Sequence, residues 1–199
     1  MATKKQVALV GDRGCGKTSL AVRLSTGIFL DYYIPTQLVD DFTAEVDARK
    51  GTCKLTLLDL SGSCDDNTIR SLVYENCDAV VVCFDLADHA SLNNVTEKWL
   101  PELETMCPGV PFILAGCKQD ETCDCEGTCP RLTSTRDSVR DLLINTRAKA
   151  YVEISSKYKD GMDELAELVV EVAQKKRTAA KKLVEAIKGS RLLKKLALV

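Results

Sequence analysis

Short runs of apolar residues recur along the chain and are separated by stretches with a helical pattern. The runs are nearly continuous rather than alternating, which is typical of strands buried on both faces of a parallel sheet. They cover residues 6–10, 53–58, 78–84, 110–115 and 150–154. The stretches between them predict helices at about residues 17–26, 91–105, 133–147 and 161–188.

One further segment has a different pattern. Residues 42–48 alternate between apolar and polar side chains, which predicts an antiparallel edge strand paired with residues 53–58. Together these elements predict an α/β protein, a three-layer α/β/α sandwich around a six-stranded, mostly parallel sheet with one antiparallel edge strand. Ligands bind such sheets at the carboxyl ends of the strands.

Charge is distributed unevenly along the 199 residues. The net charge is −2, yet residues 175–199 carry nine Lys/Arg against the single acid Glu185. That segment therefore has a charge of +8 and the other 174 residues carry −10. An acidic body argues against a nucleic-acid partner, and a basic tail favours an anionic one. We expect a domain over residues 1–174, followed by a basic helical or tail extension over residues 175–199.

The ten cysteines do not indicate a secreted disulfide scaffold, because the chain is larger than such domains and begins with no secretory signal. We expect reduced thiols and a cytoplasmic protein, with a peripheral position on the cytosolic face of membranes as an alternative. Cys123, Cys125 and Cys129 form a CxCxxxC cluster, for which we weigh an exposed thiol loop against a zinc site.

The clearest motif is residues 11–18, Gly-Asp-Arg-Gly-Cys-Gly-Lys-Thr, which match G-x-x-x-x-G-K-[ST] between a predicted strand and a predicted helix. Its backbone N–H groups and the helix N-terminus can cradle phosphate. Lys17 brings a charge to the β- and γ-phosphates, and the Thr18 hydroxyl is a ligand for Mg²⁺. The phosphate-binding candidates are Gly11, Gly14, Cys15, Gly16, Lys17, Thr18 and Ser19.

Three other strand ends carry complementary groups. Asp59 can hold Mg²⁺ through water, and the N–H of Gly62 can reach a γ-phosphate. Asp120 can accept two hydrogen bonds from a guanine edge, with the Lys118 stem over the ring. The run Ser155, Ser156 and Lys157 can offer a backbone N–H to the guanine oxygen O6.

In this order, the motifs resemble those of a Ras-superfamily small GTPase of the Rho family, over about residues 5–173. Tyr33-Ile34-Pro35-Thr36 resembles the first switch, and residues 98–103 and 107–111 resemble Rho segments. The likeness implies the P-loop small-GTPase fold, with GTP or GDP and Mg²⁺ as cofactors. It further implies nucleotide contacts from Phe29, Tyr33, Pro35 and Cys117, and Mg²⁺ ligation by Thr18, Thr36 and, through water, Asp59.

The resemblance also implies partners. Effector proteins would bind switch I (Tyr33–Phe42) and switch II (Asp59–Tyr74), exchange factors are possible further partners, and the protein would be a monomer. An anionic membrane surface is a candidate partner of residues 175–199. The chain ends Leu196-Ala197-Leu198-Val199 rather than in a Cys-a-a-X box, so we expect no prenylation.

Two positions depart from the family pattern at the catalytic centre. Arg13 replaces a phosphate-loop glycine, and Ser63 replaces the glutamine that orients the attacking water. Residues 59–63, Asp-Leu-Ser-Gly-Ser, closely resemble the Rnd branch of Rho proteins, whose members lack hydrolysis and stay bound to GTP. We therefore expect a persistently GTP-bound signalling protein, in cytoskeletal or membrane-traffic signalling. The alternatives are a cycling GTPase helped by Arg13 or a partner, and an interaction module without productive nucleotide binding.

Overall fold

A single six-stranded sheet organises the protein. The computed structural model describes residues 3–32, 35–48, 51–62, 67–122 and 130–189. The strands lie in the order β2-β3-β1-β4-β5-β6, and every neighbouring pair is parallel except β2 and β3. This confirms the predicted mostly parallel sheet with its antiparallel edge. The strands are β1 (Thr3–Gly11), β2 (Val39–Ala48), β3 (Gly51–Leu60), β4 (Ala79–Asp85), β5 (Phe112–Cys117) and β6 (Tyr151–Glu153).

The helices agree with the sequence pattern at four places and add one that it did not predict. That helix, α2, follows β3 and forms part of the predicted switch II. The predicted helix at residues 91–105 is continuous but contains a π-helical turn, η1. The bounds are α1 (Lys17–Thr26), α2 (Asn67–Asn76), α3 (His89–Asn94), η1 (Val95–Trp99), α4 (Leu100–Met106), the short 3₁₀ turn η2 (Gln119–Glu121), α5 (Pro130–Asn145) and α6 (Met162–Gly189).

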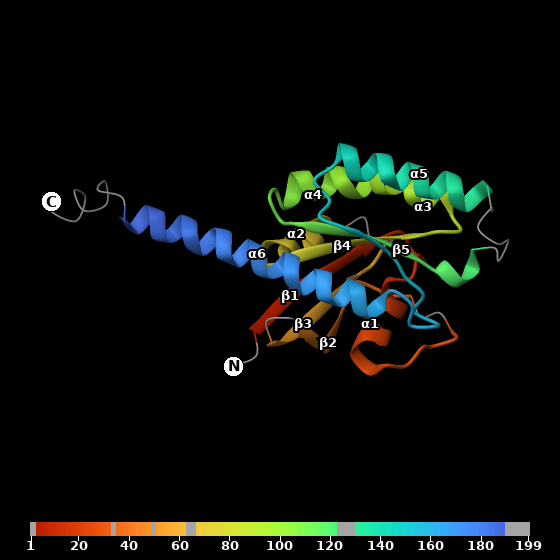
Figure 1. Cartoon of the computed structure of the whole chain (residues 1–199), viewed down its shortest axis with the longest axis horizontal. Coiled ribbons are helices and arrows are strands. Elements are labelled where there is room, and N and C mark those ends of the chain that lie inside the picture. Colours follow the sequence, from red (N-terminus) through yellow and green to blue (C-terminus); the bar gives the residue numbers. More distant parts are fainter. Residues whose placement is uncertain (1–2, 33–34, 49–50, 63–66, 123–129, 190–199) are drawn as a thin grey trace.

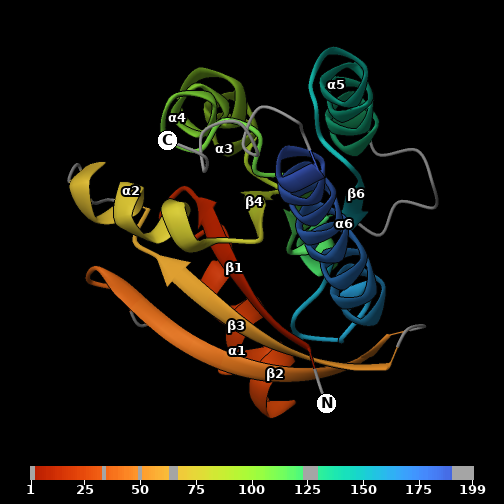
Figure 2. The same cartoon turned by 90° about the vertical axis from the view of Figure 1, so that its left-hand side faces the viewer.

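Helices cover both faces of the sheet, as Figures 1 and 2 show. Strand side chains alternate between two buried clusters because successive residues point to opposite faces. Val7, Leu9 and Val81 pack with α1 and α6 on one face. Ala8 and Val10 pack on the other face with α2, α5 and the helical segment from α3 to α4. Because these strands are parallel, the loops after β1, β3, β5 and β6 lie at the same edge of the sheet.

The last helix runs past the end of the sheet (Figure 1). Where it leaves the body, the ammonium of Lys5 donates to the backbone oxygen of Ala173 at 2.9 Å and pairs with Asp78 at 2.8 Å. Lys5 is almost fully buried, so these two acceptors compensate its charge. No helix within the described ranges is both long enough and apolar enough to cross a membrane.

A buried polar cluster joins α2 to α4. The carboxylate of Glu102 accepts from Arg70 Nε at 2.8 Å and from the Tyr74 hydroxyl at 2.6 Å. The side chain of Arg70 is only 4% exposed, and Tyr74 is fully buried. The inward face of α2 is therefore partly polar, and its polar groups are satisfied by a residue on another helix.

Glu102→Ala should lower the free energy of unfolding by roughly 3 kcal/mol, because it removes the carboxylate that serves a buried guanidinium and a buried phenol. Urea denaturation measures the change. The matched control is Glu104→Ala, since Glu104 is exposed on the same helix; it should change stability by less than about 0.5 kcal/mol. Equal effects of the two substitutions would contradict the assigned role of Glu102.

Candidate functional site

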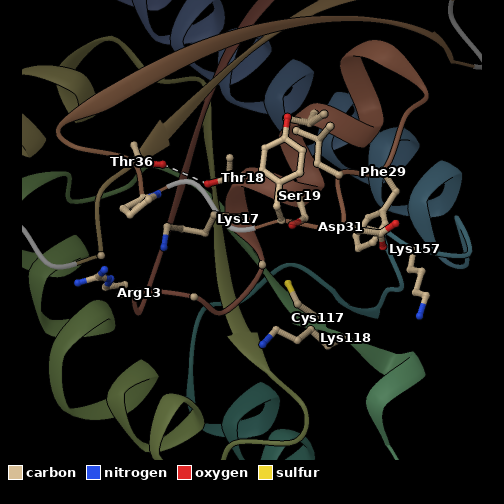
Figure 3. Close-up of a pocket in the computed structure, with 18 of the residues that line it drawn as sticks. Arg13, Lys17, Thr18, Ser19, Phe29, Asp31, Thr36, Cys117, Lys118 and Lys157 are labelled. Atoms are coloured by element: carbon tan, nitrogen blue, oxygen red, sulfur yellow. Dashed lines mark hydrogen bonds between the residues drawn. The ribbon is translucent and has the colours of Figure 1, made fainter.

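A cavity of about 990 Å³ lies at the carboxyl ends of the strands (Figure 3). Residues from the phosphate loop, α1, the first switch and the loops after β3, β5 and β6 line it. The lining residues predicted individually from the sequence are Arg13, Gly14, Gly16, Lys17, Thr18, Ser19, Phe29, Pro35, Thr36, Gly62, Cys117, Lys118, Asp120, Ser156 and Lys157. Five segments distant in sequence thus converge on one space.

Four predicted residues lie behind the lining and act through neighbours: Gly11, Cys15, Asp59 and Ser155. Two others, Tyr33 and Ser63, lie outside the described residues. The structure also adds wall residues that the sequence did not single out. These are Val22, Leu30, Asp31, Tyr32, Glu121 and Tyr158. Val22 could have been found from its position three residues after Ser19 on the same helix face, whereas the loop residues carry no comparable signal.

The phosphate loop is wrapped around the ammonium of Lys17. Its Nζ donates to the backbone oxygens of Gly11 and Asp12, at 2.9 and 2.7 Å, and the side chain is largely buried. Gly11 adopts a φ of 143°, and a Cβ there would lie 2.1 Å from the backbone oxygen of Cys83. Only glycine allows this approach to β4. The buried ammonium of Lys17 and the backbone of the phosphate loop therefore both lie at the N-terminus of α1.

Three side-chain oxygens meet beside Lys17. The hydroxyls of Thr18 and Thr36 each donate to Asp59 Oδ2, at 2.6 and 2.8 Å, and lie 3.1 Å from each other. Asp59 Oδ1 is buried and has no hydrogen-bond partner among the described residues. Burial raises the pKa of Asp59, while the two hydroxyls oppose that rise.

This cluster fits a magnesium ion by its chemistry. Mg²⁺ prefers oxygen ligands and keeps several waters, and the orphaned Oδ1 is an acceptor that metal-bound water could satisfy. A cation would also favour the charged form of a carboxyl that burial disfavours. Thr18 and Thr36 would supply direct oxygen ligands, and Asp59 would act through water.

The opposite end of the cavity carries groups suited to a base. Asp120 Oδ1 accepts from the Ser155 hydroxyl at 2.6 Å, and that hydroxyl accepts from the N–H of Tyr158 at 3.1 Å. Ser155 thus does not line the cavity but orients the carboxylate that does. Figure 3 places Phe29 and Lys157 at this end, away from Arg13 and Thr36.

Lys118 lines the cavity in a left-handed backbone conformation, with φ 58°. Its ammonium forms an ion pair with Asp85 at 2.7 Å. Burial opposes the charge of Lys118, but the hydrogen bond to Asp85 and the charge of that carboxylate outweigh it, so the pKa is raised. The residue is therefore anchored at its tip, which leaves the stem as the part that faces the cavity.

The Cys15 thiol is buried within the phosphate loop. From the sequence, its place at a helix N-terminus left open a lowered pKa, beside the simpler interpretation of a small residue that fits. Cys15 is 2% exposed, its Sγ lies 3.4 Å from the backbone oxygen of Cys83, and burial raises its pKa to about 12. The simpler interpretation is the correct one, and Cys15 contributes its backbone to the loop.

The remaining cysteines give no metal site within the described residues. Cys15, Cys53, Cys77, Cys83, Cys107 and Cys117 are buried thiols that are not part of a disulfide. No group of three or more potential ligands from His, Cys, Asp and Glu gathers in the part of the chain that the structure describes. The cluster of Cys123, Cys125 and Cys129 lies outside those residues.

Arg13 is exposed and lines the phosphate end of the cavity, on the side of Lys17 and Thr36 (Figure 3). The loop after β3 packs against its backbone: a Cβ at Gly62 would lie 2.4 Å from Arg13 N. The start of switch II and the phosphate loop are therefore in direct backbone contact.

The site thus combines a strand–loop–helix phosphate cradle, an oxygen cluster for a divalent cation and an oriented carboxylate for a base. A comparison with protein families agrees with this geometry. The family model described as the Ras family matches residues 6–175, which is most of the chain. The chain therefore belongs to the Ras family of small GTP-binding signalling proteins.

Proposed function

We propose that this protein is a GTP-binding signalling protein of the Rho type that hydrolyses GTP weakly and stays bound to it. The observation that carries the proposal is the cavity itself, which Lys17, Thr18, Thr36 and Asp120 line, with Asp59 bonded to the two threonines from behind. Release of bound nucleotide from the purified protein tests it. GTP supports the proposal, GDP supports a cycling GTPase, and an empty site supports an interaction module.

Guanine selectivity rests on Asp120. The Ser155 hydroxyl holds one oxygen of this carboxylate, so its orientation is set before a ligand arrives. A carboxylate can accept from both the ring N–H and the amino group of guanine, whereas adenine offers no such pair of donors on that edge.

Asp120→Asn should weaken guanine nucleotide binding about tenfold or more, because a hydrogen bond to a charged group contributes roughly 1.5–3 kcal/mol. The variant should gain affinity for xanthine nucleotides, whose carbonyl faces the new amide donor. Competition against a fluorescent guanine nucleotide measures both. Glu121→Gln is the matched control, since this neighbour also lines the cavity and loses the same charge. Equal competition by ATP and GTP in the wild type would contradict the assignment.

Weak hydrolysis follows from two side chains. Serine at position 63 is too short to hold the attacking water in line, and positioning supplies most of the catalysis in this reaction. Arg13 lines the phosphate end of the cavity, where a side chain of this size would crowd the space that an activator's arginine uses. The same location is also the one from which Arg13 could act in place of such an arginine, so kinetics must separate the two roles.

Restoring Arg13→Gly together with Ser63→Gln should raise single-turnover hydrolysis about tenfold or more, because it returns the water-orienting group and clears the phosphate end. Rapid-quench measurement on protein loaded with GTP gives the rate. Each single variant serves as a control for the other position. A fall in rate for Arg13→Gly alone would instead assign Arg13 a direct role in turnover.

The switches offer a surface for effectors. Leu38 in switch I is 52% exposed and Leu72 in switch II is 59% exposed. The two regions are tied by a backbone hydrogen bond from Ser61 N to Leu38 O at 3.0 Å. Nucleotide contacts at Thr36 and Gly62 would therefore change the conformation of the exposed switch residues, as effector recognition by a Ras-family protein requires.

The basic extension is the candidate for membrane attachment. Residues 175–199 carry nine Lys/Arg and one acid, and α6 leads away from the body as far as Gly189 (Figure 1). Each basic residue near an anionic surface contributes about 1 kcal/mol. The protein would then be cytoplasmic, with a salt-sensitive peripheral position on membranes.

Full-length protein should pellet with phosphatidylserine vesicles at low salt, and truncation after Gln174 should abolish this, because the truncated chain loses the +8 segment while keeping Lys5 and its acceptor Ala173. Phosphatidylcholine vesicles are the control for charge dependence. Equal pelleting of both proteins, or of neither, would remove the membrane role.

A further inference from the structure

The side chain of Asp12, in the phosphate loop, is held by two donors from one helical segment. Asn94 Nδ2 donates to Asp12 Oδ2 at 2.6 Å, and Trp99 Nε1 donates to Asp12 Oδ1 at 2.9 Å. We call these three residues the clamp. Each carboxylate oxygen has its own donor, and hydrogen bonds to an ionised acceptor are about twice as strong as neutral ones. The clamp therefore fixes both position and rotation of this side chain.

The π-helical turn is what allows both donors to reach Asp12. Asn94 ends α3 and Trp99 ends η1, so they are five residues apart. On an α-helix, residues five apart point about 140° away from each other. In the π-turn the backbone bonds i to i+5, as the N–H of Leu100 does to Val95 O, which brings residues five apart onto one side. Such turns occur frequently at functional sites, and this one aims two side chains at the phosphate loop.

Asp12 connects the clamp directly to the predicted phosphate ligand. Its side chain is held by α3 and η1, while its backbone oxygen accepts from Lys17 Nζ at 2.7 Å. A backbone movement at Asp12 that displaced this acceptor of the buried ammonium would therefore also strain both hydrogen bonds of the clamp. The remaining acceptor, Gly11 O, lies on the adjacent residue.

The indole of Trp99 is itself fixed from the switch II side. The ring is 1% exposed, and the guanidinium of Arg70 lies over it at 5.7 Å from the centroid. Arg70 is in turn bonded to Glu102. One ring thus contacts α2 through its face and the phosphate loop through its N–H.

We propose that Asn94 and Trp99 are positioning residues for nucleotide retention: by clamping Asp12 they keep the phosphate loop in its binding conformation and slow nucleotide release. The inference rests on the proposed nucleotide binding and goes beyond it, because neither residue lines the cavity. Without the clamp, the phosphate loop in the nucleotide-free protein samples more conformations, so the affinity of the protein for nucleotide falls. Changes of this kind appear mainly in the dissociation rate.

The central test exchanges the two polar partners. Asn94→Asp sets a second carboxylate against Asp12 and should speed release of a fluorescent GDP analogue about tenfold or more. Asn94→Ala, a milder change, should speed it several-fold. Asp12→Asn combined with Asn94→Asp restores one donor and one acceptor between the positions, with an amide oxygen left for Trp99, and should return the rate to within about threefold of wild type. Asn93→Asp is the matched control, since Asn93 is exposed on the same helix.

A second measurement reports on the clamp without nucleotide. Trp99 is the only tryptophan in the chain, so intrinsic emission comes from the clamp. Asn94→Asp should shift the emission maximum, whereas Asn93→Asp and the exchange variant should match wild type. Guanine-over-adenine preference should be the same in all variants, which a general loss of folding would not preserve.

The outcomes separate the two proposals. Wild type that binds no guanine nucleotide would overturn the proposed function, and the emission series would still decide whether the clamp exists. The positioning role would be overturned if Asn94→Asp and Asn93→Asp released nucleotide at the same rate. It would also be overturned if the exchange variant released nucleotide as fast as Asn94→Asp.

Discussion

The need to compensate one buried ammonium governs the architecture of the site. Lys17 is largely buried, and a cation removed from water must find acceptors in the protein. Backbone oxygens at the end of β1 and in the following loop supply them, so the loop curls around the lysine rather than crossing the sheet edge. The same loop carries the backbone N–H groups with which this motif can cradle phosphate. The loop conformation that compensates the buried ammonium of Lys17 is thus also the one that can bind phosphate.

Local motifs were predictable because their physics is local. The spacing of Gly11, Gly16 and Lys17 fixes a turn between a strand and a helix whatever surrounds it, and the apolar runs are the buried strands of the sheet. Topology then brings strand ends together without further information, since parallel strands place their carboxyl ends at one edge. The sequence could for this reason indicate both the cavity and the groups that face it.

Contacts between polar groups on distant elements were not predictable. Trp99 is a buried core residue, yet the partner of its indole N–H lies 87 residues away in the chain. Lys118 was expected to lie over a base, and its pairing with Asp85 depends on the register of β4 and β5. Helix α2 escaped notice because its inward face includes Arg70 and Tyr74. Such pairs follow from three-dimensional placement, which periodicity does not encode.

The bond from Lys5 to Ala173 joins the first strand to the last helix, across 168 residues. β1 is also the strand between β3 and β4 in the sheet. During synthesis the ribosome therefore releases the centre of the fold first and its closing contact last. Until α6 emerges, Lys5 lacks its acceptor Ala173, and α1 alone covers the apolar face of the sheet that α6 later completes. The core on this face is therefore complete only when nearly the whole domain has been synthesised, and until then the apolar surface that α6 covers stays exposed.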